Sequence, residues 1–457
     1  MSKPTIVCAG MCNTKSAEIR YLAEQVAEQG GEPIIMDISL GASVDWADIS
    51  LEEVLASTGT RVEEVFSAPR AIAIDLVGRA GAVKILELHA GGRCDGIISW
   101  AGSVGTTTAT RIMRALPFGV PKVMLTDMAS SDVSMWLGNK DIYISNPTAE
   151  QGINIVTHKA VANAAAAVVA MARVPEVPPG SRPLVALTSY GTTTPTVRRC
   201  AEFMEARGWD ASIFHAVGAG ATMEDLIRSG LIKAIIDITP AELMNNLFGS
   251  VYGTPKTWEG DRLTAASEMG IPQVVVPGGL DQAALGPLHT VAPEYLDDVK
   301  QERRKSYLGT GLPYRHNDSV TIMLPTLEEV ERVSLEIARK LNDTRGPTAF
   351  IIPMRGWSAY DQSQDLATLQ RGWAEGNGDG PTWLPDPSQP IWSQRATLML
   401  SVLQKHLTPS NPNLDLIACD LHILDSEFAD LLDRCIGDMI DKRWRRGLYR
   451  DVRGVVA

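Results

Sequence analysis

Short apolar runs alternate with stretches of helical periodicity along most of the chain. The first repeat of this pattern is complete, with an apolar run at 5–9, a turn at 10–14, a helical period over 16–29 and a second apolar run at 33–37. Strand, helix and strand in succession form a βαβ unit, whose strands are parallel and whose crossover is right-handed. The pattern therefore predicts an α/β fold with mainly parallel sheets.

The same scheme restarts after a proline-rich segment at 174–180, with a new apolar run at 184–188. In the first half, a helix end, a glycine and an apolar strand follow one another over 86–98, and the same order recurs over 226–236. Self-similarity along a chain is the sequence signature of duplication. We therefore expect two Rossmann-like domains related by an internal duplication.

The boundary between the two domains is expected in the proline-rich segment, because domains are joined by exposed linkers of this composition. It divides the chain into an N-terminal Rossmann-like domain, residues 1–178, and a C-terminal Rossmann-like domain, residues 181–457. Within the second domain, a polar stretch rich in glycine, proline and tryptophan at 357–394 predicts a long inserted loop.

Charge and cysteine usage narrow the range of partners. The net charge is −12, whereas a nucleic-acid binder usually carries a basic face. The basic cluster at 442–446 fits the end of a surface helix better than a nucleic-acid contact. There is no secretory signal, and no apolar run reaches the ~18–20 residues that a membrane span needs. The cysteines include no CxxC pair. We expect a cytoplasmic protein with reduced thiols that binds neither nucleic acid nor a membrane.

The loop at 10–18 is the first candidate for ligand binding, because ligands of open parallel sheets bind at the carboxyl ends of the strands. It opens a helix, whose N–H groups attract anions, and Thr14, Lys15 and Ser16 add hydroxyls and a positive charge. The glycine spacing of a Walker A loop is absent. An ordinary helix cap with a solvated lysine is the alternative.

The loop at 100–108 carries a stronger signal, with two glycines and four hydroxyl residues between a strand and a helix. Glycine lets the backbone approach a ligand closely, and successive N–H groups form an anion nest. A third loop, 126–132, is also rich in hydroxyl side chains, but a run this short fits helix capping at least as well.

Loops of the second half gather residues suited to proton transfer. Histidines and acidic residues follow its strands at His215, His316, His422, Asp237, Glu242 and Asp281. One interpretation is a hydrolase or lyase acting on a small oxyacid, with Arg315 and Arg355 holding a carboxylate and His215, Glu242 or His316 moving protons. The other is a binding or regulatory protein without chemistry. A divalent metal is conceivable in such a cluster, but no ligand spacing supports one, so no metal ligand is assigned.

The same loops resemble those of a known family. The matching stretches are Asn13–Lys15, Asp75–Arg79, Gly102–Thr106, Ala115–Lys122, Ala162–Ala165, Gly191–Pro195, Phe214–Ala216, Gly270–Val274, Tyr314–Asn317 and Arg355–Ser358. In this order, they resemble the ATP-binding family typified by the tomato mosaic virus resistance protein. The chain departs from the family's usual pattern at Asn13, Ser16 and Val104, where aspartate, glycine and glycine are common.

The resemblance implies two Rossmann-like domains, nucleotide binding in the first of them, and a homodimer. It places ATP, another nucleotide or another small anion on three loops of the first domain. Their expected ligand-binding residues are Asn13, Thr14, Lys15, Gly102, Ser103, Gly105, Thr106, Ser130, Ser131 and Asp132.

Overall fold

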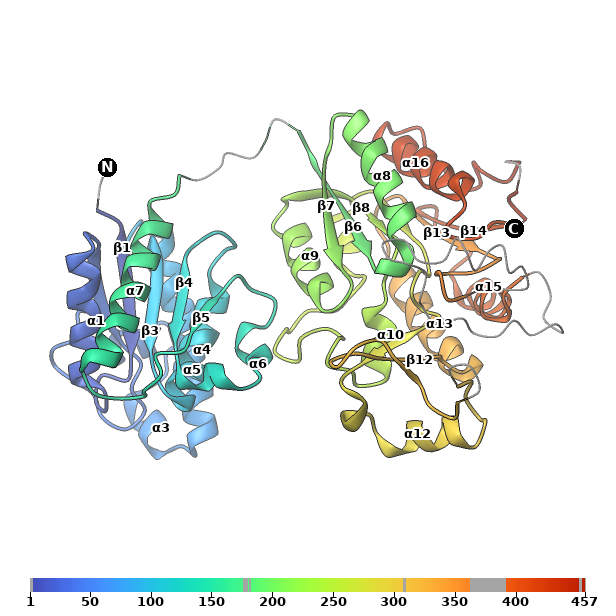
Figure 1. Ribbon diagram of the computed structural model, residues 1–457. Helices are drawn as coiled ribbons and strands as arrows, with labels where there is room; N and C mark the ends of the chain where they lie inside the picture. Colours follow the sequence, from blue (N-terminus) through green and yellow to red (C-terminus); the bar gives the residue numbers. More distant parts are fainter. Residues whose placement is uncertain are drawn as a thin grey trace. The chain divides into compact units, whose positions relative to one another are not determined.

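The chain forms two compact units, Met1–Pro178 and Pro179–Ala457, in the computed structural model (Figure 1). The residues that it describes are 3–175, 180, 182–306, 310–361, 392–451 and 454–456. Most of the expected insertion at 357–394 therefore lies outside the described residues. Each unit contains one parallel sheet, which confirms the predicted α/β fold.

The N-terminal unit is built on a five-stranded sheet in the order β2-β1-β3-β4-β5, in which every neighbouring pair is parallel. Its strands are β1 (Thr5–Gly10), β2 (Glu32–Asp37), β3 (Gly96–Trp100), β4 (Lys122–Leu125) and β5 (Tyr143–Ser145). The order reverses at β1, since the chain places β2 on one side of β1 and β3 on the other. Such a reversal is where open α/β sheets bind their ligands.

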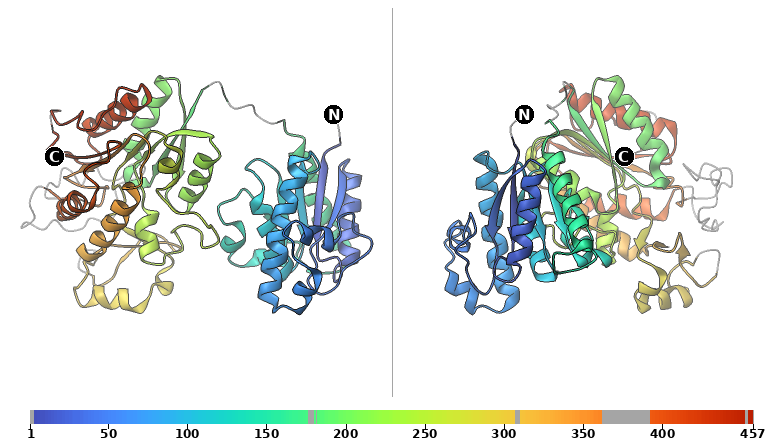
Figure 2. Two further views of the ribbon diagram at one scale, coloured as in Figure 1. Left: turned by 180° about the vertical axis from the view of Figure 1, so that it is seen from behind. Right: turned by 60° about the vertical axis from the view of Figure 1, so that its left-hand side comes forward.

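Helices cover both faces of this sheet (Figure 2). They are α1 (Ser16–Glu28), α2 (Leu51–Ala56), α3 (Val62–Ser67), α4 (Arg70–Ala90), α5 (Ser103–Ala115), α6 (Ser134–Leu137) and α7 (Ile155–Ala172), with the short 3₁₀ turn η1 (Asp127–Ser130). Alternate residues of β1 point to opposite faces. Ile6 and Cys8 pack with α1 and α7, whereas Val7 and Ala9 pack with α4 and α5.

Helix α7 is long and apolar enough to cross a membrane by length and composition. Its buried side, which includes Val161, Ala165 and Val168, packs on α1 and the sheet. The core helix of a soluble protein meets the same criterion, so this one helix is only weak evidence for a membrane span.

The C-terminal unit contains a six-stranded parallel sheet in the order β14-β13-β9-β8-β6-β7. Its strands are β6 (Leu184–Ser189), β7 (Asp210–His215), β8 (Ile232–Asp237), β9 (Gln273–Val275), β13 (Thr348–Pro353) and β14 (Leu414–Cys419). The first four strands of each unit follow the same spatial order, second, first, third and fourth. This shared order is what the predicted duplication requires.

Helices again cover both faces of the sheet (Figure 1). The described ones are α8 (Thr194–Ala206), α9 (Ala219–Arg228), α10 (Glu242–Leu247), α11 (Ala265–Met269), α12 (Pro293–Lys300), α13 (Leu327–Leu341), α15 (Gln394–His406) and α16 (Ser426–Ile440), with 3₁₀ turns η2 (Gly191–Thr193) and η3 (Leu288–Thr290). Helices α8 and α16 share one core with the sheet, and α13 and α15 share another.

A small antiparallel sheet, β10-β12-β11, is added to the C-terminal unit. Its strands are β10 (Ala283–Leu285), β11 (Tyr314–Arg315) and β12 (Thr321–Met323). The hydrophobic pattern of the chain does not predict this sheet.

Candidate functional site

A cavity of about 480 Å3 opens in the N-terminal unit beside the loops that follow β1 and β3. Asn13, Thr14 and Lys15 line it from the first loop, and residues 101–105 line it from the second. The structure therefore places the predicted residues Gly102, Ser103 and Gly105 in the same wall as the first loop. This wall stands at the reversal of strand order, where a ligand site is expected.

Two helices begin in this wall. Helix α1 starts directly after Lys15 and α5 directly after Gly102, and no side chain caps the first turn of either helix. N–H groups at such helix ends carry partial positive charge and favour a bound anion. Gly105 allows the close packing here, because a Cβ atom at this position would lie 2.5 Å from the Cβ of Ala101.

Lys15 adds a full positive charge to the wall. Its side chain is almost entirely buried, and its Nζ donates a hydrogen bond of 2.6 Å to the backbone oxygen of Glu150. The same Nζ lies 3.6 Å from Oε1 of Glu150. That carboxylate also lies against the start of α5, since a Cβ on Gly102 would be 2.5 Å from Oε1. A carboxylate thus occupies a position that suits an anionic ligand.

The remaining lining residues are mostly apolar. They include Leu40, Val65, Phe66, Ala68 and Ala73, and the exposed Arg70 among them adds a second positive charge. Phe66 is 40% exposed, so it presents part of its ring to a ligand. A cavity that joins an anion-binding end to an apolar end suits a molecule with a charged group and a flat apolar group.

Buried hydrogen bonds fix the two loops in place. The N–H of Asn13 donates to Oγ of Ser39, whose own N–H and hydroxyl donate to Asp37. Thr106 donates through Oγ1 to the Gly102 oxygen at 2.8 Å and to Oγ1 of Thr126 at 2.8 Å. Thr106 is fully buried and lies outside the lining, so it supports the loop and does not face a ligand.

The third predicted loop does not reach the cavity. Ser130 and Ser131 donate through their hydroxyls to the backbone oxygens of residues 127 and 128, and Asp132 accepts from the N–H of Ser134. These are local turn and capping contacts, the alternative that the sequence left open for this loop. The placement of Ser130, Ser131 and Asp132 in a nucleotide site finds no support in this geometry.

The five residues expected to form a catalytic site in the second half do not come together. His215 and His316 line one cavity, of about 660 Å3, and Glu242, Arg315 and Arg355 do not. Arg315 pairs with Asp318. Arg355 forms a bidentate ion pair with the Asp420 carboxylate, with hydrogen bonds of 2.9 and 3.0 Å. The two arginines are therefore matched by nearby carboxylates rather than held free for a substrate.

Glu242 belongs instead to a buried ionic cluster around Arg262. The guanidinium group of Arg262 contacts Asp237 at 2.7 Å, Glu224 at 3.2 Å and Glu242 at 3.4 Å, and all four side chains are inaccessible to solvent. Burial raises the pKa of Glu224 and Glu242, and the charge of Arg262 opposes that rise. This cluster ties loops at the end of β8 together, and no signal in the sequence singled out Arg262.

Asp281 is a further buried acid of this unit. It accepts a 2.6 Å hydrogen bond from the hydroxyl of Ser358, while its other oxygen has no hydrogen-bond partner among the described residues. Burial, together with the charge of Asp361, raises the pKa of Asp281 to about 7. His422 is held nearby, with Nε2 at 3.0 Å from the backbone oxygen of Asp361.

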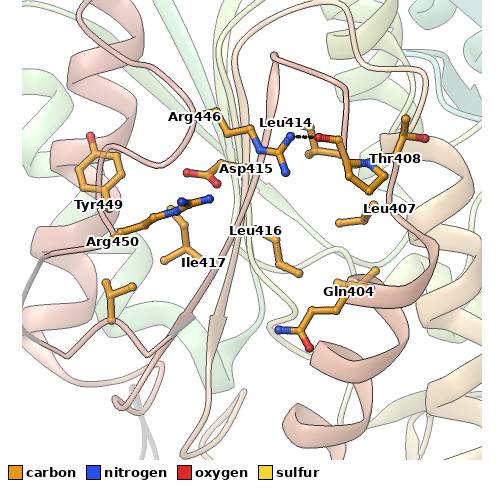
Figure 3. A pocket seen from close by; sticks show the side chains of 13 residues that line it. Gln404, Leu407, Thr408, Leu414, Asp415, Leu416, Ile417, Arg446, Tyr449 and Arg450 are labelled. Atoms are coloured by element: carbon orange, nitrogen blue, oxygen red, sulfur yellow. Dashed lines mark hydrogen bonds between the residues drawn. The ribbon is translucent and has the colours of Figure 1, made fainter.

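A third cavity, of about 230 Å3, lies beside the edge strand β14 (Figure 3). Arg446 and Arg450 approach Asp415 there, and Arg446 donates a hydrogen bond to the backbone oxygen of Pro409. Asp415 stands at the amino end of β14, whereas ligands of parallel sheets bind at the carboxyl ends. This cavity is therefore a weaker candidate than the other two.

Metal and thiol chemistry find no support in the described part of the chain. No group of three or more histidine, cysteine or acidic side chains there is arranged to hold a metal ion. All the cysteines are buried and unpaired, and burial raises the pKa of the Cys94 thiol to about 12. A thiol with such a pKa is a poor nucleophile.

Comparisons with known proteins agree with the resemblance seen in the loops. Residues 4–177 match the N-terminal domain, and residues 182–371 the C-terminal domain, of the uncharacterised protein family UPF0261. A UPF0261 protein of Clostridium tetani is 36% identical over 79% of this chain and 86% of its own length. One from Rhizobium meliloti is 35% identical over 78% and 85%. The ToMV resistance protein Tm-1(GCR237) of Solanum lycopersicum is 26% identical over 94% of this chain, but over only 55% of its own length.

Proposed function

This chain belongs to the uncharacterised protein family UPF0261, and we propose that its N-terminal unit binds ATP or a related nucleoside phosphate. The observation that supports the proposal is the convergence of Lys15 with the uncapped starts of α1 and α5 on one cavity. These groups suit the phosphates, because helix N-termini and a lysine together favour a polyanion. The apolar side around Val65 and Phe66 suits the base.

The Glu150 carboxylate occupies the position that the proposal assigns to a phosphate group. It stands beside Lys15 and the start of α5, so a phosphate group would take its place. Glu150 lies in an exposed loop and its side chain is half exposed, which leaves it room to move aside. Binding therefore exchanges one anion for another, and the affinity reflects the difference between the two.

Titration calorimetry with three ligands tests the proposal. ATP probes the whole cavity, tripolyphosphate the anion-binding end, and adenosine the apolar end. We expect ATP to bind more tightly than either fragment. Lys15→Met should weaken the binding of ATP by about tenfold to a hundredfold, the range for loss of a charge-assisted hydrogen bond. Lys159→Met, at an exposed lysine of α7, is the matched control and should bind like the wild type.

A single outcome decides against nucleotide binding. If saturating ATP produces neither heat nor a rise in melting temperature, the folded state does not bind it, since a ligand of the folded state must stabilise that state. The resemblance also leads us to propose a homodimer, and light scattering coupled to gel filtration would measure twice the mass of one chain.

A further inference from the structure

Besides Lys15, the lining of the N-terminal cavity of about 480 Å3 contains the cation Arg70. Arg70 is the first residue of α4 and belongs to the chain segment 65–73, which also contributes Val65 and Phe66 to the wall. Its side chain is exposed, and no hydrogen bond or ion pair joins it to another residue in the described part of the chain. Arg70 therefore offers a charge that a ligand in this cavity can use.

The position of this charge in α4 is unfavourable without an anion. A helix N-terminus carries partial positive charge from the helix dipole, so a cation there is repelled. The first turn of α4 contains no acidic residue, and Pro69, which precedes it, has no side-chain group that could cap the N–H groups. An arginine and uncapped N–H groups at one point of a cavity wall suit an anionic group of a ligand.

Helices α4 and α5 begin at about the same level on one edge of the sheet. Both run antiparallel to β3, which lies between them in the chain, so both start at the carboxyl edge. Gly78 lies against Arg111, because a Cβ on this glycine would be 2.6 Å from Cδ of the arginine. Gly78 is as far from the start of α4 as Arg111 is from the start of α5. Packed helices lie roughly 8–10 Å apart, so the two starts are separated by about this distance.

The cavity thus has two separate positions for anionic groups. Lys15 and the starts of α1 and α5 form the first, and Arg70 at the start of α4 forms the second. A phosphate chain places its phosphates next to one another. A phosphate on the 2′- or 3′-oxygen of a nucleotide is instead separated from the 5′-phosphate by the ribose, which matches two positions on different helices more closely. Arg70 also shares its chain segment with Phe66, the side that suits the base.

We propose that this cavity selects a nucleotide with a second phosphate on the 2′- or 3′-oxygen of its ribose, and that Arg70 is the residue that selects it. The 5′-phosphate would lie at Lys15, the ribose phosphate at Arg70 and the base on Phe66. This inference rests on the proposed binding of a nucleotide and adds to it the class of nucleotide that is bound.

Titration calorimetry of the full chain with matched adenine nucleotides tests this selectivity. ADP and adenosine 3′,5′-bisphosphate carry the same number of phosphate groups, and only the bisphosphate has one on the 3′-oxygen. Adenosine 2′,5′-bisphosphate tests the other isomer. We expect one of the two bisphosphates to bind about tenfold more tightly than ADP, the lower end of the range for a charge-assisted hydrogen bond. In phosphorus NMR, the signal of its ribose phosphate should shift on binding.

Variants of Arg70 then locate the second phosphate. Arg70→Gln should weaken the preferred bisphosphate by about tenfold and change the affinity for ADP by less than about twofold, because ADP has no phosphate at this position. Arg70→Lys keeps the charge and should recover part of the affinity. Lys15→Met should weaken both ligands. Arg79→Gln, at an exposed arginine of α4 outside the cavity, is the matched control and should bind both ligands like the wild type.

The ligand-free protein provides an independent check of the arginine at the helix start. Arg70 is exposed, so Arg70→Gln should fold normally. Its melting temperature should equal or slightly exceed that of the wild type, since the substitution removes a cation from a helix N-terminus. A clear fall in melting temperature would show that Arg70 supports the fold of the free protein, and would contradict its assignment to a ligand.

Two binding results would overturn this selectivity and leave nucleotide binding intact. The first is ADP that binds at least as tightly as both bisphosphates. The second is a variant Arg70→Gln that binds the bisphosphate like the wild type, or that loses the same affinity for ADP as for the bisphosphate, which would place Arg70 on the 5′-phosphates. If no nucleotide produces heat or a rise in melting temperature, the proposed nucleotide binding itself fails, and this inference fails with it.

Discussion

Replacing Glu150 by glutamine isolates the electrostatic part of the proposed nucleotide site. The glutamine keeps the size of the side chain and leaves the backbone oxygen of residue 150 to accept from Lys15. It removes the carboxylate that lies 3.6 Å from Nζ of Lys15 and against the start of α5. In the wild-type protein, an incoming phosphate must displace this carboxylate. The variant should therefore bind ATP and tripolyphosphate more tightly than the wild type.

The size of the gain follows from the exposure of the pair. Lys15 is buried, but the Glu150 side chain is 50% exposed, so solvent screens the interaction. A pair of this kind contributes about 1 kcal/mol or less, and a carboxylate at a helix N-terminus adds about 0.3–1 kcal/mol. Loss of the competing charge should thus tighten ATP binding by about fivefold, and by no more than about thirtyfold. Without ligand, the variant should be less stable by a similar small amount.

Calorimetry at low and high ionic strength checks both the sign of the change in ATP affinity and its electrostatic cause. The gain should shrink as salt is added, because screening weakens the removed repulsion. Glu24→Gln, at an exposed position of α1, changes the net charge equally and should leave ATP affinity within twofold or so. If Glu150→Gln instead weakened ATP binding, Glu150 would be holding Lys15 in its binding position, and the displacement argument would be refuted.

Three further changes test the structure elsewhere. Arg262→Met should destabilise the C-terminal unit by about 3–5 kcal/mol in urea denaturation, because it leaves buried carboxylates without their cation. The pKa of Asp281 is raised in the folded state from 3.8 to about 7. Its contribution to stability is therefore complete below about pH 4 and is lost as the pH rises towards 7, by at most about 1.4 kcal/mol per pH unit. Asp281→Asn should abolish this loss of stability. Gly105→Ala should destabilise the N-terminal unit by about 1–3 kcal/mol, since its methyl group would meet Ala101 at 2.5 Å, whereas Gly191→Ala enters open space and should unfold at a similar temperature to the wild type.

Most strands of the two parallel sheets could be predicted from the sequence, and the clearest are those that are buried on both faces. β13, Thr348–Pro353, is buried at every position and is a continuous run of mostly apolar residues. The small antiparallel sheet could not be predicted for the opposite reason. Its strands at 283–285, 314–315 and 321–323 are too short to display a period, and their pairing depends on contacts distant in the sequence.

In the candidate nucleotide site, the loops could be predicted but their individual hydroxyls could not. Glycines and a lysine at the start of a helix form a local signal, and Lys15 and Gly102 do line the cavity. A threonine in the same loop can face a ligand or bind the backbone, and Thr106 does the latter. Glu150 gave no signal at all, because it lies 135 residues from Lys15 in an exposed loop.

Charged residues at the rim of the second sheet illustrate why position does not establish function. Topology determines which side chains end at the carboxyl edge, but tertiary contacts determine whether a partner of opposite charge is already there. Arg355 is 65 residues from Asp420 and still pairs with it through two hydrogen bonds. His215 and His316 follow strands of the same unit and, in contrast to Arg355, line a cavity at this sheet edge. The sequence could place all of these side chains at the ends of strands, but only the folded chain shows which of them reach a cavity.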